Sequence, residues 1–239
     1  MNGTLFRLAL RRLLQRRRSA LLAFAPLLSA LVALIQAAEG TSGADAFASL
    51  MEQLFLPLIL PFIALVIGSS ALGEERDDGT ILYLASTPLP RLAIALPAVA
   101  AAALTTVVLC LPGLLITIAL SPGGDLSASA AGWAIVSVVA GAVAYAAAFG
   151  ALSLRVKRPV VVGLIYVLFW EGSIGTFAPS ARWLSLGAYA RAIVACGLPP
   201  ETAHNVPAIG VAASILVLAG LAGLATLWCG RRLKHIELP

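Results

Sequence analysis

Glu171 is the residue best placed to carry chemistry, because it is the only acidic side chain deep within an apolar stretch of the sequence. If a helix begins at Pro159 and rises about 1.5 Å per residue, the carboxylate lies about 18 Å into a bilayer. A carboxylate at that depth usually faces protein or water and could bind a proton or a cation. The alternative is structural: Glu171 could pair with Arg182 or Arg191, or a helix break could let it reach the outer surface.

Other catalytic groups are scarce. The two histidines, His204 and His235, fall on opposite sides of the predicted membrane layout, so they cannot form a paired metal site. The sequence has no HExxH and no GxSxG motif. A phosphate-binding loop needs Gly-Lys followed by Ser or Thr, yet Lys157 and Lys234 follow Val156 and Leu233. We therefore expect no enzymatic activity, no metal, no cofactor and no nucleotide site in this chain.

A second candidate site is the segment 73–91, GEERDDGTILYLASTPLPR, between two apolar stretches. Asp77 and Asp78 favour the N-terminus of a short helix, and Thr80 could cap it one step later. Gly79 permits a sharp turn, and Pro88 ends the helix. The helix would expose an apolar patch made of Ile81, Leu82, Tyr83, Leu84 and Ala85. A patch of this kind on the aqueous side predicts contact with a partner protein.

The composition places this segment in a membrane protein. Of the 239 residues, 60% are hydrophobic and 11% are charged, and the mean hydropathy is +0.98. A crossing helix needs about 20 apolar residues. The sequence supplies six such stretches, at 19–38, 54–72, 92–120, 130–154, 159–178 and 207–230. We predict an all-α integral membrane fold, with residues 1–239 forming a single transmembrane domain and residues 39–53 an outer loop.

The positive charges predict the orientation of the six stretches. Fourteen of the 16 Lys and Arg residues fall on the side of the N-terminus, and Arg182 and Arg191 are the exceptions. Because Lys and Arg are enriched in cytoplasmic loops, both termini are predicted to be cytoplasmic. The net charge of +5 is therefore a topology signal rather than a sign of nucleic-acid binding.

Residues 1–18 have the period of an amphipathic helix. Leucines, Phe6 and Ala9 share one arc, whereas Arg7, Arg11 and Arg18 share the other. We expect this helix to lie in the membrane interface with its arginines among the head groups. The alternative is that these arginines only set the topology.

The last outer segment, 179–206, contains Trp183 and Tyr189 and is broken by Pro199 and Pro200. Because Trp and Tyr favour the membrane–water interface, short helices at the outer face are expected here. They could cover a translocation path or form an ordinary interfacial loop.

The stretch ERDDGTILYLASTPLPR resembles the pattern E-R-x-x-G-T-x-x-x-L-x-x-x-P-x-x-R, which follows the second transmembrane helix in permeases of type-2 ABC exporters. The matching positions are Glu75, Arg76, Gly79, Thr80, Leu84, Pro88 and Arg91. The resemblance implies that this loop is a coupling helix that docks into a groove of an ATPase subunit. It also implies six spans, an interfacial N-terminal helix and short outer helices before the last span.

Two further comparisons qualify the resemblance. Family members often carry a Gly-Lys pair at the start of the third span, where this chain has Pro97 and Ala98. The stretches WEGSIG (170–175) and LSLGAYARAI (184–193) are similar to the fifth span and outer helices of some bacterial members.

The function that the resemblance implies is ATP-driven export across a bacterial or archaeal cytoplasmic membrane. Two permeases, identical or related, would form the path, and two ATPase subunits would bind ATP and Mg and drive it. The apolar spans favour a lipid-like or amphipathic cargo over a sugar. Two alternatives stay open: an ion-driven carrier or channel that uses Glu171, and a membrane scaffold that transports nothing.

Overall fold

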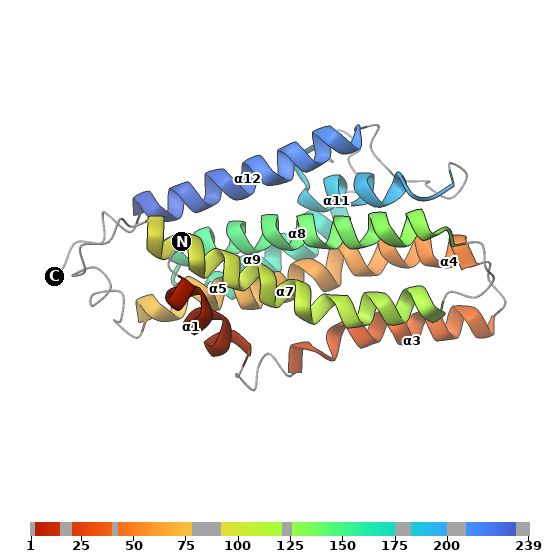
Figure 1. Ribbon diagram of the computed structural model, residues 1–239, viewed down its shortest axis with the longest axis horizontal. Helices are drawn as coiled ribbons and strands as arrows, with labels where there is room; N and C mark the ends of the chain where they lie inside the picture. The colour runs from red at the N-terminus through yellow and green to blue at the C-terminus, as the bar shows by residue number, and fades with distance from the viewer. Residues whose placement is uncertain are drawn as a thin grey trace.

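The computed structural model describes residues 3–14, 21–39, 43–77, 92–120, 126–174, 183–199 and 209–232. Within these ranges the chain is helical and contains no strand, which confirms the predicted all-α class. The longer helices run roughly along one axis, and the N-terminal helix α1 (Gly3–Leu14) lies at one end of the bundle (Figure 1). The last helix, α12 (Val211–Arg232), ends on the same side of the bundle as α1.

Four helical stretches of the described chain are long and apolar enough to cross a membrane. They are Gly43–Gly73, α7 (Leu92–Leu120), α8 (Ala128–Arg155) and α12. The bounds of α7 agree with the predicted span 92–120, and those of α8 lie within two residues of the predicted span 130–154. Shorter apolar helices are α3 (Ala25–Ala38), α9 (Pro159–Ile165) with η2 (Tyr166–Ile174), and α11 (Leu186–Ala195). The chain is an integral membrane protein.

The first predicted span, 19–38, is longer than the helix found there. Helix α3 begins at Ala25 and has Pro26 in its first turn, where the missing amide of a proline is tolerated. Its 14 residues rise about 21 Å, which is less than the roughly 30 Å of a hydrocarbon core.

The predicted outer loop 39–53 is wrong from Gly43 onward. Helix α4 (Gly43–Leu50) continues through the π-helix η1 (Met51–Ile59) into α5 (Leu60–Asp77). The segment was expected to be a loop because it lies between the predicted spans 19–38 and 54–72. Phe47, Leu50 and Met51 nevertheless follow helical spacing and are buried, whereas Asp45 is exposed. Helix α5 also extends past the predicted end of the second span, at residue 72.

The wide turns of η1 include Pro57, which has no amide hydrogen to donate to a preceding carbonyl. Inserting a π-helical register is one way for a helix to accommodate such an interruption. Segment η1 packs against η2, so two π-helical segments are neighbours in the bundle.

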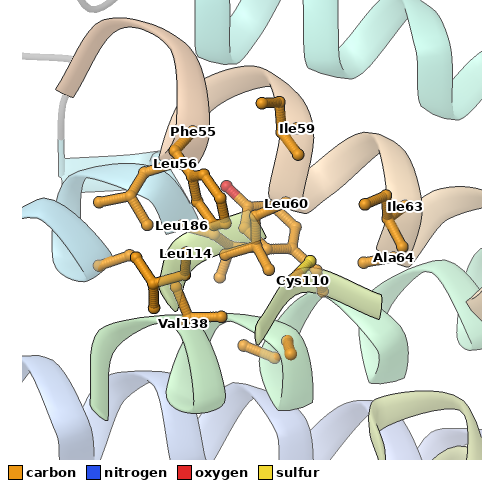
Figure 2. Packing of buried hydrophobic residues seen from close by; sticks show 14 of the residues in the cluster. Phe55, Leu56, Ile59, Leu60, Ile63, Ala64, Cys110, Leu114, Val138 and Leu186 are labelled. Atoms are coloured by element: carbon orange, nitrogen blue, oxygen red, sulfur yellow. The ribbon is translucent and has the colours of Figure 1, made fainter. Parts of the chain in front are cut away.

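Helix α8 lies at the centre of the bundle and packs against α5, α7, α11 and α12. Its contact with α5 is close, because a Cβ atom on Gly68 would lie 2.9 Å from the carbonyl oxygen of Ala146. Figure 2 shows the main core, where side chains from η1, α5, α7, α8 and α11 meet. Examples are Phe55, Leu60, Cys110, Val138 and Leu186.

Most of the positive charges gather at one end of the bundle. Of the ten Lys and Arg residues in the described ranges, nine belong to the end formed by α1 and the C-termini of α5, α8 and α12: Arg7, Arg11, Arg12, Arg76, Arg155, Lys157, Arg158, Arg231 and Arg232. The last turn of α5 adds Glu74, Glu75 and Asp77 to this end. The opposite end carries Glu39, which follows α3, and Asp45, in the first turn of α4. We refer to the first as the basic end.

Helix α1 has the predicted amphipathic period, and its apolar side contacts protein. Leu13 is buried, and Phe6, Ala9 and Leu10 pack against the main core. Arg7 and Arg11 are exposed, whereas Arg18 lies outside the described residues. The helix packs chiefly on α7, so the bundle covers part of the face that was expected to dip into lipid.

Candidate functional site

Glu171 is held inside the bundle by a cluster of donors that we call the Glu171 clasp: Tyr145, Tyr166, Ser185 and Gly187. The carboxylate is only 2% exposed. Its nearest donor in sequence is Tyr166, whose hydroxyl donates to Oε1 at 3.1 Å. In an α-helix, the side chains of residues five apart point in directions that differ by about 140° around the axis. In a π-helix, backbone hydrogen bonds join residues five apart, so such residues lie on the same side. The π-helical register of η2 therefore brings Tyr166 and Glu171 to one side.

The other donors come from two neighbouring helices. The Tyr145 hydroxyl of α8 donates to Oε1 at 2.9 Å. The Ser185 hydroxyl donates to Oε2 at 2.5 Å, and the Gly187 amide at the start of α11 donates to Oε1 at 3.2 Å. Four donors thus engage both carboxylate oxygens, which is how a buried acidic group is normally satisfied.

Ser185 links the carboxylate to the N-terminus of α11. Its extended backbone makes it the N-cap residue, and its Oγ accepts a hydrogen bond from the Ala188 amide at 3.1 Å. One hydroxyl therefore accepts from the helix and donates to Glu171. A negative charge next to the first amides of a helix is also favoured by the helix dipole.

Gly187 is required by this arrangement. A Cβ atom at this position would lie 2.5 Å from Glu171 Oε2 and 3.2 Å from the Tyr145 hydroxyl oxygen. A side chain would therefore force either α11 or the carboxylate to shift. A second bond, from Ser137 Oγ of α8 to the Ala190 carbonyl oxygen at 2.6 Å, holds α11 on the same face of α8.

The arginine partners suggested for Glu171 are not among these donors. Arg191 is half-buried, and its Nε has no hydrogen-bond partner among the described residues. Arg182 lies outside the described residues. The carboxylate does not reach the surface, because α11 and α8 cover it. Its geometry suits a fixed structural junction between η2, α8 and α11.

No group of three or more His, Cys, Asp or Glu side chains that could hold a metal gathers in the described part of the chain. Sequence reasoning found Glu171 but missed its partners. A tyrosine inside an apolar span was the available signal, because a buried hydroxyl needs a hydrogen-bond partner.

A second feature, which we call the arginine groove, adjoins the clasp. It is an open apolar groove of about 750 Å³ between α8, α9–η2, the start of α11 and α12. Tyr166 belongs to both features, since its hydroxyl binds Glu171 and its side chain lines the groove. The other lining residues are Ala148, Phe149, Leu152, Val162, Leu184, Leu186, Leu221, Leu224, Ala225, Leu227, Trp228 and Arg231.

The predicted coupling segment is described only at its beginning. The backbone of Glu75, Arg76 and Asp77 forms the last turn of α5, at the basic end. The remaining residues assigned to it, Asp78, Gly79, Thr80, Ile81, Leu82, Leu84, Pro88 and Arg91, lie outside the described residues.

Comparison with known protein families agrees with the resemblance found in the sequence. The family described as "ABC-2 family transporter protein" matches residues 14–177, which include the segment 73–91 and Glu171. The match ends before α11 and α12. A search among curated proteins found no match. Because the family match covers more than half of the 239 residues, this chain belongs to the ABC-2 family of membrane transport permeases.

Proposed function

We propose that this chain is the permease subunit of an ATP-driven ABC exporter that moves a substrate across the cytoplasmic membrane. The observation that carries the proposal is the family match over residues 14–177, which includes the segment 73–91. Membership in this family implies an ABC ATPase partner. ATP and Mg²⁺ would be bound by that partner and not by this chain.

The charge distribution supports an assignment of the basic end to the cytoplasm. Lys and Arg are enriched on the cytoplasmic side of membrane proteins, and nine of the ten described Lys and Arg residues lie at this end. Helix α5 ends here at Asp77, and α7 begins here at Leu92. The segment that joins them would therefore meet an ATPase on the cytoplasmic side, with both chain termini on that side too.

In the proposed mechanism, two copies of this chain, or this chain and a relative, assemble with two ATPase subunits. Closure of the ATPases on ATP pushes the coupling segment around Ile81 to Ala85. The push reaches α5 and α7, which flank the segment, and then α8, because α5 and α8 are in close contact at Gly68. Tightly packed helices transmit such a displacement as rigid bodies.

Glu171 has a positioning role in this proposal. An ion-driven carrier would need the carboxylate to be accessible to a proton or cation. The four donors that engage both oxygens and the 2% exposure favour a fixed junction instead. The clasp would keep α11 seated on α8 while the cytoplasmic half of the bundle moves.

The proposal can be tested by co-expressing the full chain with an ABC ATPase from the same genome and purifying the complex. We expect the ATPase to co-purify with the wild-type chain. Leu84→Asp should abolish co-purification because it places a charge in the apolar docking patch, and Gly79→Pro should weaken it by restricting the turn. Unchanged assembly and ATP turnover in Leu84→Asp would refute the proposed docking.

A matched control adds the same charge elsewhere. Ala128 is exposed at the start of α8, at the opposite end of the bundle. Ala128→Asp should leave both assembly and turnover unchanged, because an acidic residue in the first turn of a helix is favourable.

A further inference from the structure

We propose that the arginine groove binds an anionic phospholipid of the leaflet at the basic end, with its phosphate at Arg231 and an acyl chain along α12. This inference concerns a lipid ligand of the chain and does not depend on the ATPase partner. It rests on the lining of the groove, its length, its charge and its contrast with a second groove on the same helix.

One face of α12 forms a wall of the arginine groove. Leu221, Leu224, Ala225, Trp228 and Arg231 all line it and recur at the three- and four-residue spacing of a single helical face. The face is apolar for about two turns, from Leu221 to Ala225, and then carries the indole of Trp228 and the guanidinium of Arg231. This order from apolar to amphipathic to charged matches the change from acyl chain to head group in a lipid leaflet.

The length of this face fits one leaflet. Ten residues separate Leu221 from Arg231, which corresponds to about 15 Å along the helix axis. Half of a hydrocarbon core of about 30 Å has the same thickness. An acyl chain that begins beside Arg231 would therefore run to the level of Leu221 near the bilayer centre.

The groove offers apolar surface to a ligand that enters from the side. Leu224 is 65% exposed and Leu184 is 70% exposed, although both line the groove. The volume of about 750 Å³ lies within the range of small-molecule sites. In a membrane such a surface is already next to lipid, so an acyl chain can fill it without any rearrangement of the bundle.

Arg231 supplies the selectivity for an anionic head group. Among the described residues that line the arginine groove it alone is charged, and it is exposed at the basic end. A guanidinium binds phosphate oxygens through two parallel hydrogen bonds. In a zwitterionic head group the negative charge of the phosphate is already balanced by the cation of the same lipid, so Arg231 attracts it less. Arg155, Lys157 and Arg158 lie at the same end of the bundle and add to the positive potential there.

A second groove provides an internal comparison. It measures about 620 Å³ and lies between α7, α8 and the other side of α12. Its lining includes Leu96, Val139 and Thr226 and, within the described part of the chain, no charged residue. The Thr226 hydroxyl donates to the Ala222 carbonyl oxygen of its own helix. We call it the neutral groove. It should accept acyl chains without selecting for the head group.

The test uses the full chain in phosphatidylcholine vesicles that contain a trace of either photoreactive phosphatidylglycerol or photoreactive phosphatidylcholine. After illumination, mass spectrometry locates the labelled residues. We expect phosphatidylglycerol to label the arginine groove about fivefold more than phosphatidylcholine, the selectivity that one interfacial arginine confers. The neutral groove should be labelled equally by both lipids.

Two pairs of variants sharpen the test. Arg231→Gln should reduce phosphatidylglycerol labelling to the phosphatidylcholine level, whereas Arg232→Gln should keep the selectivity, because Arg232 points about 100° away around the helix and does not line the groove. Leu224→Trp should fill the groove and reduce labelling by both lipids. Leu216→Trp should not, because Leu216 is 72% exposed on α12 and lines neither groove.

Three outcomes would overturn the proposal. One is equal labelling of the arginine groove by both lipids. Another is an equal loss of selectivity in Arg231→Gln and Arg232→Gln. A third is the absence of lipid label together with a chain-to-chain disulfide through Leu224→Cys, which would show that a second copy of this chain occupies the groove.

Discussion

The carboxylate of Glu171 accepts a hydrogen bond from the backbone amide of Gly187 at 3.2 Å, across 16 residues of sequence. This contact joins the π-helix η2 to the N-terminus of α11. It is possible only because position 187 has no side chain, since a Cβ atom there would overlap the carboxylate.

Removing the Glu171 carboxylate should destabilise the protein. Glu171→Ala leaves the hydroxyl of Tyr145, the amide of Gly187 and their neighbours without an acceptor in a buried site. We expect a loss of at least about 2 kcal/mol, which corresponds to a fall of about 4–8 °C in Tm. Tryptophan fluorescence during heating in detergent measures the change.

The control for this variant is Glu39→Ala, which removes an exposed carboxylate at the end of α3. Its effect should stay within about 0.5 kcal/mol. Equal melting temperatures for Glu171→Ala and the wild type would contradict a structural role for the clasp.

A methyl group at position 187 should also be destabilising. In Gly187→Ala the Cβ atom would lie 2.5 Å from Glu171 Oε2, so α11 or the carboxylate has to shift. Overpacking of this kind costs about 1–3 kcal/mol. Gly220→Ala in α12 is the matched control, because nothing lies within 4 Å of its Cβ position. It should be neutral or stabilising by up to about 1 kcal/mol, and a larger loss there than at Gly187 would contradict the packing described.

The two tyrosine hydroxyls should act as a coupled pair. Tyr145→Phe and Tyr166→Phe each remove one donor to the same oxygen of Glu171. Each change should lower the free energy of unfolding by about 0.6–1.7 kcal/mol. The double variant should lose at least about 0.5 kcal/mol more than the sum, because the remaining donor partly compensates in each single variant.

Tyr189→Phe is the control for this coupling, because the Tyr189 hydroxyl donates to the Trp183 carbonyl oxygen and not to Glu171. When Tyr189→Phe is combined with Tyr145→Phe, the two losses in the free energy of unfolding should simply add. Double-mutant cycles on the free energy of unfolding measure the coupling of Tyr145 with Tyr166 and of Tyr145 with Tyr189. Strict additivity between Tyr145→Phe and Tyr166→Phe would mean that their hydroxyls do not share the carboxylate.

Much of the fold follows from the sequence, because apolar stretches bounded by charges and Gly-Pro turns fix long helices in a membrane. Helix α7 agrees with its predicted bounds for that reason. The helix over residues 43–53 was missed because the segment lies between two predicted spans, although Phe47 and Leu50 are buried in the core. Helix α3 was predicted too long because leucines before Pro26 continue the apolar pattern.

The candidate site was predictable only in part. Glu171 stands out because a carboxylate in an apolar stretch is rare. Its partners depend on the π-helical register of η2 and on the seating of α11 against α8, and neither is visible in residue spacing. In the sequence Arg231 is interpreted as a topology signal. Its place in the lining of a groove emerges only when α12 packs beside α8 and α11.

The most direct test of the central claim is a cross-linking measurement on the segment that joins α5 and α7. In a Cys196→Ser background, Leu84→Cys should cross-link in membranes to the co-expressed ABC ATPase and should resist impermeant thiol reagents added outside intact cells. Ala128→Cys, at the opposite end of the bundle, should show the reverse behaviour. Labelling of Leu84→Cys from outside the cell, with no cross-link to the ATPase, would contradict the assignment of this chain as a permease driven from the cytoplasm.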